Sequence, residues 1–349
     1  MKFSTFTLSQ VPDSERTVEF LDDQFNQFIL AEKLGFSTVW IAEHLFSTHG
    51  TFSSTQVLAG AIARATTTIR IGTAVSIVAF NHPLRTASDF AAIDCMSHGR
   101  LNYGTGRAYQ VAEFEALGLD MSKSRDLYRE SLDIILKSWS GEPFTYEGQF
   151  WTIPKPVRVY PRLVQQPRPP IYTAANSRES FIEAGQQGFH VLTSATFAWL
   201  GKGRDWVEDL ASNLEAYDRA CQEAGHDPKK MERALMMSCH VAPSAEAAEQ
   251  KYGPCIDWSM RGHAKRAQTD GSLTASGSPQ ASNWGFEGLK AAGAVLVGDA
   301  ESAVRHIRHL KKRLGFTELI LEFNRGGLPN RDVEAAMHLF MERVAPNAG

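Results

Sequence analysis

Eight short, apolar, β-rich runs alternate with longer segments of helical periodicity along this chain of 349 residues. The β-rich runs are residues 2–8, 38–42, 69–78, 100–106, 171–175, 189–194, 234–242 and 318–323. Strands that alternate with helices predict parallel pairing with right-handed crossovers. No GxGxxG motif follows the first run, which disfavours an open dinucleotide-binding sheet. We therefore predict an α/β fold, a single eight-stranded (β/α) TIM-type barrel with insertions that spans residues 1–349.

Two stretches interrupt this alternation. Residues 141–170 contain turn pairs, alternating aromatic residues and several prolines, which predict a hairpin followed by an extended connector. Residues 261–284 are rich in Gly, Ser, Thr, Ala and Gln and lack apolar periodicity. A structureless insertion of this length is either disordered or a functional lid. Its position between the seventh and eighth β-rich runs favours a mobile lid at the reactive end of the barrel.

Charge and cysteine usage disfavour several classes of function. The formal net charge is -3, with acidic and basic residues interspersed, so the basic surface that nucleic-acid binding requires is not expected. The four cysteines form no CxxC motif and the histidines lack metal-ligand spacing, which argues against a disulfide framework and a metal site. Neither a signal-peptide pattern nor a membrane-spanning apolar run is present, so we expect a cytoplasmic protein without membrane contact.

The residues that follow each β-rich run are the candidates for chemistry, because reactive groups of an α/β barrel lie at the carboxyl ends of its strands. Glu43 and His44 follow the second run, and Glu113 lies in the loop after the fourth. Histidine is the side chain best suited to proton transfer near neutral pH. We predict His44 and Glu113 as catalytic residues and Glu43 as a structural one. The alternative is that His44 is itself a hydrogen-bonded structural residue.

Two further segments have the composition of a phosphate site. Gly104 and Gly106 permit close backbone approach, and Arg107 offers a planar guanidinium that suits phosphate. Residues 174–180 place an Asn-Ser pair at the expected start of a helix, where capping side chains and backbone N–H groups favour an anion. Each segment alone also fits a tight turn or an ordinary helix cap. The two follow adjacent strands and should therefore converge, which favours a phosphate-bearing cofactor.

Longer runs throughout the chain carry a resemblance to a known family. They are MKFSTF (1–6), TVWIAEHLF (38–46), IRIGTAVSIVAFNHPLRTASDFAAIDCMSHGRLNYGTGR (69–107), GLDMSKSRDLYRE (118–130), PPIYTAANSRESFIEAGQQGF (169–189) and LILEFNRGGLPNRDVEAAMHLFMERVAP (319–346). In these runs the sequence resembles the bacterial luciferase-like flavin-dependent monooxygenases. The resemblance implies an α/β barrel that binds reduced FMN (FMNH2) supplied by a separate flavin reductase. Molecular oxygen then forms a C4a-hydroperoxyflavin, which oxygenates a small, largely apolar organic substrate.

The resemblance also implies a role for individual residues. His44 matches the family's catalytic histidine, and Glu113 matches its carboxylate on a following loop. Arg107 matches the arginine that binds the flavin phosphate. Ala74 and Val75 match the two residues that form, in this family, a non-proline cis peptide against the flavin ring. The full set assigned to the cofactor is Ala74, Val75, Gly106, Arg107, Tyr109, Arg125, Ala175, Asn176, Ser177 and Ser180.

The chain departs from luciferase at three informative positions. Gly106 stands where luciferase has a reactive cysteine, Leu45 follows the histidine, and Asn176 replaces an acidic residue beside the phosphate serine. These differences argue against light emission from a long-chain aldehyde. They leave hydroxylation, epoxidation and Baeyer–Villiger insertion open. The alternatives are a deazaflavin-dependent dehydrogenase with the same barrel and a non-catalytic flavin-binding subunit.

A homodimer and a closed apolar pocket complete the expectations. Ala59, Gly60 and Ala63 allow close approach of another helix, and the family pairs its barrels through the helices after strands two and three. A reactive flavin intermediate survives only where water is excluded. The aromatic residues expected to enclose such a pocket are Phe6, Phe46, Phe80 and Trp199.

Overall fold

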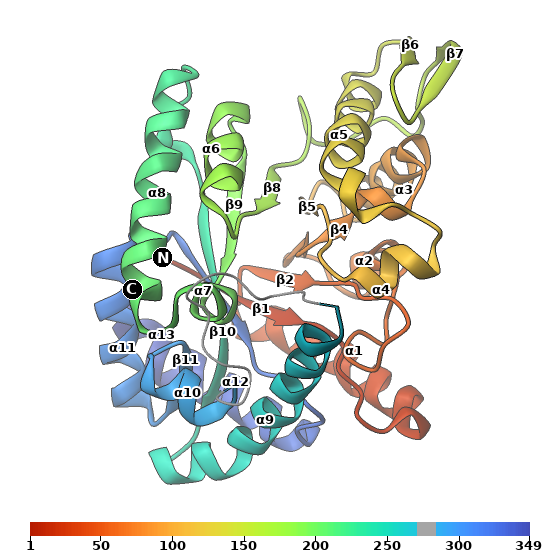
Figure 1. The fold of residues 1–349 in the computed structure, drawn as a ribbon. Helices are drawn as coiled ribbons and strands as arrows, with labels where there is room; N and C mark the ends of the chain where they lie inside the picture. Colours follow the sequence, from red (N-terminus) through yellow and green to blue (C-terminus); the bar gives the residue numbers. More distant parts are fainter. Residues whose placement is uncertain (271–283) are drawn as a thin grey trace.

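A closed ring of eight parallel strands forms the centre of the molecule, and helices surround it (Figure 1). The computed structural model describes residues 1–270 and 284–349. The ring consists, in order, of β1 (Lys2–Thr7), β2 (Thr38–Ile41), β3 (Arg70–Thr73), β5 (Leu101–Gly106), β8 (Ile171–Ala174), β9 (His190–Ser194), β10 (Arg233–Val241) and β12 (Glu318–Glu322). It closes because β12 pairs with β1, with Glu318 opposite Lys2. The predicted eight-stranded α/β barrel is confirmed.

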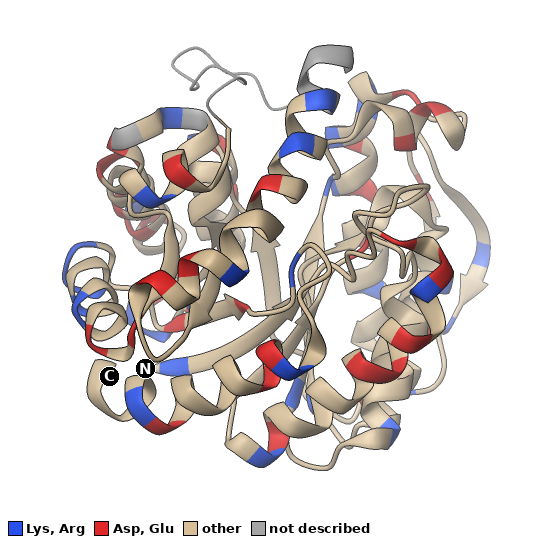
Figure 2. Ribbon diagram, turned by 90° about the horizontal axis from the view of Figure 1, so that it is seen from below, with Lys and Arg blue, Asp and Glu red and all other residues tan. Residues whose placement is uncertain are grey.

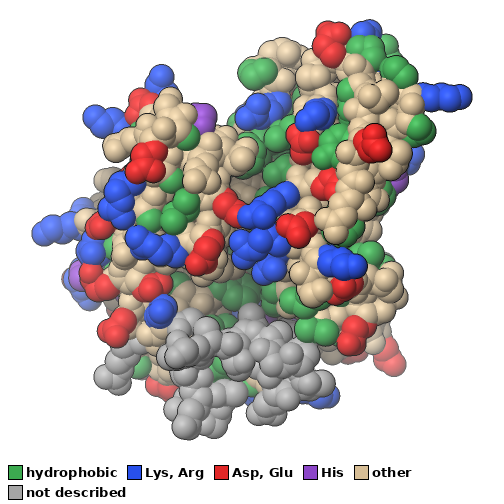
Figure 3. Space-filling view, turned by 45° about the horizontal axis from the view of Figure 1, so that its top comes forward, with side chains coloured by type: hydrophobic (Ala, Val, Ile, Leu, Met, Phe, Trp, Pro, Cys, Tyr) green, Lys and Arg blue, Asp and Glu red, His purple; other side chains and the backbone are tan. Residues whose placement is uncertain are grey.

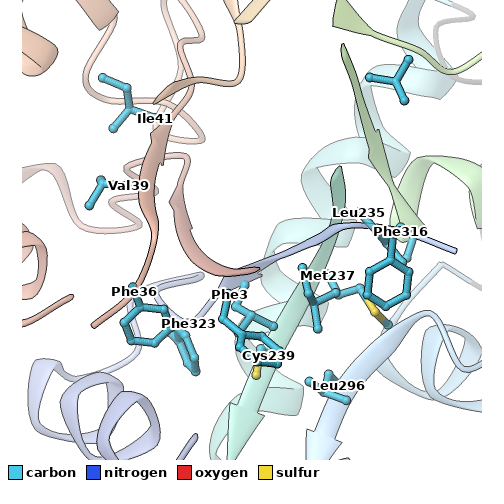
Figure 4. Packing of buried hydrophobic residues seen from close by; sticks show 14 of the residues in the cluster. Phe3, Phe36, Val39, Ile41, Leu235, Met237, Cys239, Leu296, Phe316 and Phe323 are labelled. Atoms are coloured by element: carbon cyan, nitrogen blue, oxygen red, sulfur yellow. The ribbon is translucent and has the colours of Figure 1, made fainter. Parts of the chain in front are cut away.

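The helices pack their apolar faces on the outside of this ring. Their bounds are α1 (Thr17–Leu34), α2 (Thr55–Ala65), α3 (Pro83–Met96), α4 (Val111–Ala116), α5 (Ser124–Ser140), α6 (Arg178–Gln187), α7 (Ala195–Lys202), α8 (Trp206–Glu223), α9 (Ala245–Asp270), α10 (Phe286–Ala291), α11 (Ala300–Leu314), α12 (Asn330–Leu339) and α13 (Ala345–Ala348). Between helices and strands lies the larger hydrophobic core, in which Phe3, Val39 and Leu235 point outward from their strands (Figure 4). Seen from below, basic and acidic residues are interspersed around the helices (Figure 2).

The residues that alternate with these outward-facing ones along each strand point inward, because successive residues of a strand face opposite sides. Their side chains fill the interior of the ring in layers. Phe6, Trp40, Leu192 and Ile320 belong to this inner cluster. In the lower layer Glu318 is buried and accepts hydrogen bonds from Ser4 Oγ and, at 2.7 Å, from Trp40 Nε1. Two and four residues further along β12, Ile320 and Glu322 reach the level at which the barrel opens.

The segment between β5 and β8 projects beyond the ring. After α5 the chain forms an antiparallel hairpin of β6 (Phe144–Glu147) and β7 (Thr152–Val157), which lies beside the end of α5 (Figure 1). An extended connector with cis peptide bonds at Tyr160–Pro161 and Gln166–Pro167 then returns to β8. Asp94 on α3 anchors this connector, since its Oδ2 accepts hydrogen bonds from the backbone N–H groups of residues 164 and 165.

The expectation of a structureless insertion from residue 261 is wrong for its first part. Residues 261–270 continue α9, whose residues Tyr252, Ile256 and Met260 are already buried at a spacing of four. An existing helix extends at little cost through Ala, Lys, Arg and Gln, which favour helix without apolar periodicity. The remainder of the expected lid, up to residue 283, lies outside the described residues.

Two short strands lie outside the closed ring. β4 (Ser76–Ile77), which falls within the predicted β-rich run 69–78, pairs with the end of β5, and β11 (Val295–Gly298), which the sequence did not predict, pairs with the second half of β10. Both extend the barrel wall above the level at which the ring closes. Among the helices of residues 1–270 and 284–349, none has the length and apolarity needed to cross a membrane.

Candidate active site

A cavity of about 920 Å³ opens at the carboxyl ends of the barrel strands. Its floor is the upper part of the inner cluster and consists of apolar side chains, among them Phe6, Leu192, Met236 and Ile320. In the space-filling view this face is hollowed, with basic side chains gathered in the middle of the hollow and acidic ones beside them (Figure 3). The cavity therefore lies at the face of the barrel that the strand-end rule predicts.

His44 and Glu113 meet at one side of this cavity, although 69 residues separate them. His44 follows β2, Glu113 lies in α4, and both side chains are buried. His44 Nδ1 lies 3.1 Å from Glu113 Oε1, and that oxygen also accepts a hydrogen bond of 2.7 Å from Leu45 N. Glu113 Oε2 lines the same region without a hydrogen-bond partner among the described residues. The two residues that the sequence predicted as catalytic are therefore in contact.

Two neighbours of His44 complete its surroundings. Tyr109 OH lies 3.3 Å from His44 Nε2, and the two rings meet edge to face. Gln110, which the sequence did not single out, is buried with its Nε2 2.6 Å from His44 Nδ1. Nδ1 can donate to Glu113 or accept from Gln110, so these neighbours decide which ring nitrogen carries the proton. No motif marks Gln110, because its role follows only from how the loop after β5 folds back.

Glu43 has the structural role that the sequence predicted. Its Oε1 accepts a hydrogen bond of 2.7 Å from Ile77 N, and its Oε2 accepts bonds from Thr55 N and Thr55 Oγ1. These bonds tie the loop after β2 to the start of α2 and to β4. Burial, only partly offset by these hydrogen bonds, raises the pKa of Glu43 to about 7. The carboxyl thus titrates near neutral pH beside His44.

The wall between β3 and β5 is shaped by glycine. A Cβ at Gly104 would lie 1.8 Å from the carbonyl oxygen of Thr73, so only glycine allows the two strands this approach. A Cβ at Gly106 would lie 2.5 Å from Val75 Cγ2. A side chain at position 106, where the resemblance implied a cysteine in luciferase, would therefore meet the Val75 side chain. The peptide bond between Ala74 and Val75 is cis, as the resemblance implied, and both residues line the cavity.

The opposite end of the cavity has the features of an anion site. Ser177 caps α6 in a reciprocal capping box with Ser180, whose Oγ accepts hydrogen bonds from Asn176 N and Ser177 N at 3.1 and 3.0 Å. Arg107 lies across the cavity in the loop after β5, with Nη1 3.4 Å from Ser124 Oγ. A capped helix N-terminus opposite a guanidinium favours a negatively charged ligand.

Two further charges border this anion site. Arg125 on α5 lies 3.5 Å from Glu183 Oε1 on α6, so its charge is partly neutralised. Arg107 forms no ion pair within the described part of the chain. Partial burial first, and the positive charge of Arg125 second, lower the pKa of Arg107. Both effects disfavour an unpaired guanidinium, and an anion bound between the two arginines would relieve them.

Not every predicted residue lies where it was expected. All members of the predicted catalytic and cofactor sets line the cavity except Ala175, which is fully buried in the outer core with its N–H bonded to Leu192 O. Alternation along β8 explains this, because Ala174 faces the cavity and its neighbour must face the helices. Of the aromatic residues expected to enclose the pocket, Phe6 does so, whereas Phe46 is 71% exposed and Trp199 belongs to the outer core.

Comparison with known proteins agrees with this geometry. The family model for luciferase-like monooxygenases matches residues 1–318. The oxygenase component of a flavin-dependent trigonelline monooxygenase from Acinetobacter baylyi is 29% identical over 252 aligned residues, covering 71% of this chain and 67% of the relative. An alkanal monooxygenase alpha chain from Photobacterium leiognathi is 24% identical over 360 aligned residues, covering 99% of each chain.

Two solved structures share the complete fold. Monooxygenase RslO1 from Streptomyces bottropensis has a TM-score of 0.88 at 26% identity and covers all of both chains. The oxygenating constituent of 3,6-diketocamphane monooxygenase from Pseudomonas putida, solved with FMN, has a TM-score of 0.83 at 20% identity and covers 99% of this chain and 98% of its own. The predicted enzyme class, a flavin-dependent monooxygenase, is confirmed. The chain belongs to the luciferase-like monooxygenase family.

Proposed function

We propose that this chain is the oxygenase component of a two-component monooxygenase that uses reduced FMN from a separate flavin reductase. One atom of molecular oxygen enters a small organic substrate and the other leaves as water, with reduced FMN supplying both electrons through a C4a-hydroperoxide. The observation that carries the proposal is the convergence, in one cavity, of the His44–Glu113 pair with the capped N-terminus of α6 and Arg107. The relative described as an oxygenase component and the neighbour solved with FMN support it.

The residues present fit FMN. Its phosphate would lie at the N-terminus of α6, where Ser177, Ser180 and backbone N–H groups gather opposite Arg107, with Asn176 and Arg125 beside them. The small residues Ala74, Gly106 and Ala174 line the wall between the phosphate end and His44, and leave room for a flat ring. Tyr109 borders the same space.

The chain's own contribution to the chemistry is proton control and exclusion of water. Nε2 of His44 lies near Tyr109 OH, while Nδ1 lies within hydrogen-bond distance of Glu113 and Gln110 and bonds to one of them according to the tautomer. An imidazole held in this way moves a proton to or from the reacting oxygen and substrate. Glu113 orients the ring, since Leu45 N fixes the carboxylate in place. The apolar floor keeps bulk water from the reacting atoms.

The assay for this function is oxidation of reduced FMN in air, followed by absorbance in a stopped-flow instrument. With the protein in excess we expect a flavin intermediate that lives much longer than in buffer alone, and the same mixture with serum albumin should match buffer. A deazaflavin-dependent dehydrogenase would leave reduced FMN to oxidise at the rate seen in buffer. That result, with protein that is folded by circular dichroism, would contradict the proposed function.

We also propose a homodimer formed through α2 and α3. The small residues of α2 do not by themselves form the contact surface, because Ala59 and Ala63 are buried within the subunit and Gly60 faces Met96 of α3. Val57 of the same helix is 74% exposed and is the apolar residue available to a second copy. Light scattering should give about twice the chain mass of 38.6 kDa. A particle of single-chain mass would count against the dimer.

A further inference from the structure

A second buried ion pair lines the cavity away from the anion site. Glu322 ends β12 and Arg325 lies in the turn that follows it, and their side chains are 0% and 3% exposed. Arg325 Nη1 lies 2.5 Å from Glu322 Oε2, and Ser238 Oγ on β10 donates to the same oxygen at 2.9 Å. Arg325 Nη2 donates to Ser259 Oγ on α9 at 3.0 Å. The pair is thus held by serines of two other elements, β10 and α9.

One polar atom on each member of this pair remains without a partner among the described residues. These atoms are Glu322 Oε1, an acceptor, and Arg325 Nε, a donor. A buried polar group without a hydrogen bond is costly, and native proteins usually satisfy it with protein, water or ligand. Neither residue takes part in the proposed FMN phosphate site or in the His44–Glu113 contact. Their unused atoms therefore indicate a ligand group in this part of the cavity.

The charges and surroundings of the pair restrict that ligand. The ion pair is neutral overall, so a carboxylate would be repelled by Glu322 and an ammonium by Arg325. A hydroxyl group is both a donor and an acceptor, so it offers the kind of partner that Glu322 Oε1 lacks and the kind that Arg325 Nε lacks. Met236 and Ile320, which line the cavity on the same two strands as Ser238 and Glu322, offer an apolar surface to the rest of the molecule.

We propose that Glu322 and Arg325 form a substrate subsite that binds a neutral hydroxyl group carried on an apolar body, such as a phenol or alcohol. The inference rests on the proposed function in one respect, namely that the ligand is the substrate of the flavin reaction. It narrows the substrate class to molecules that already carry this group, and it disfavours plain hydrocarbons and organic acids.

Binding of three matched probes to the FMN-loaded protein tests the subsite. The probes are 2-naphthol, 2-methylnaphthalene and 2-naphthoate, whose dissociation constants are measured by calorimetry at pH 7. A hydrogen bond to a charged group predicts that 2-naphthol binds at least about tenfold more tightly than the other two. Equal binding of 2-naphthol and 2-methylnaphthalene, or tighter binding of 2-naphthoate, would overturn the proposal. FMN binding is recorded in the same titrations, so loss of the cofactor is distinguished from failure of the subsite.

Variants of two glutamates on the same face of β12 give the matched control. Glu322→Gln should abolish the preference for 2-naphthol, whereas Glu318→Gln, which changes a buried carboxyl one layer below the cavity, should keep it. Loss of the preference in both variants, or in neither, would contradict the assignment to Glu322. If Glu322→Gln does not fold, the double variant Glu322→Gln/Arg325→Gln, which removes both charges together, takes its place. The binding of the three probes to the wild-type protein tests the subsite independently of any variant.

Discussion

Replacement of Arg107 by alanine measures the anion site directly, because FMN and riboflavin differ only by the phosphate. Arg107 is partly exposed, donates one long hydrogen bond to Ser124 and forms no ion pair among the described residues, so its charge is available to a ligand. A hydrogen bond to a charged group is worth roughly 1.5–3 kcal/mol. Solvent screening at an exposed position favours the lower end of that range. Arg107→Ala should therefore weaken FMN binding by about tenfold.

Flavin fluorescence titration of both ligands provides the assay. For Arg107→Ala we expect the Kd of FMN to rise and the Kd of riboflavin to stay the same. The control is Arg85→Ala on α3, which removes an equal charge at an ion pair with Asp89 that does not line the cavity. It should change neither constant. An unchanged FMN constant in Arg107→Ala, or equal weakening of both ligands, would refute the assignment of Arg107 to the phosphate.

Two further substitutions test the other side of the cavity. His44→Ala should lower substrate oxygenation by about 100-fold or more while the Kd of FMN stays nearly unchanged, and a fully active variant would remove His44 from the mechanism. Glu43→Gln tests the buried carboxyl by urea unfolding across pH. Because the pKa of Glu43 is raised from 4.5 to about 7, the folded protein retains a proton that the unfolded chain releases. The free energy of unfolding of the wild type should therefore fall relative to that of the variant by about 3 kcal/mol as pH rises from about 4.5 to about 7. If the difference in unfolding free energy between the two proteins does not change with pH, the folded carboxyl titrates normally.

The barrel and the location of the site were predictable because both follow from periodicity. Alternation of strands and helices fixes the topology, and the strand-end rule then brings His44 and Glu113 to one face without any knowledge of loop structure. The same rule brings Arg107 and Ser177 together, since β5 and β8 are neighbours in the ring. The position of Ala175 outside the cavity also follows from the sequence, because strict alternation along β8 sends its side chain away from the cavity.

Features that depend on how loops fold could not be predicted in the same way. Gln110 contacts His44 only because the loop after β5 turns back across the cavity, and no spacing in the sequence specifies that turn. Phe46 was expected inside the pocket from its apolar character, but it points outward in the loop after β2. The helical state of residues 261–270 follows from propagation of α9 rather than from their own pattern. The partnership of Glu322 and Arg325 depends on Ser238 and Ser259, which are distant in sequence.

A crystal structure of the protein with FMN bound is the most direct test of the account. It should show the phosphate at the N-terminus of α6 in contact with Arg107 and Ser177, and the ring beside His44 and the Ala74–Val75 peptide. FMN bound elsewhere on the molecule, or bound in this cavity with its phosphate away from α6, would contradict the central claim.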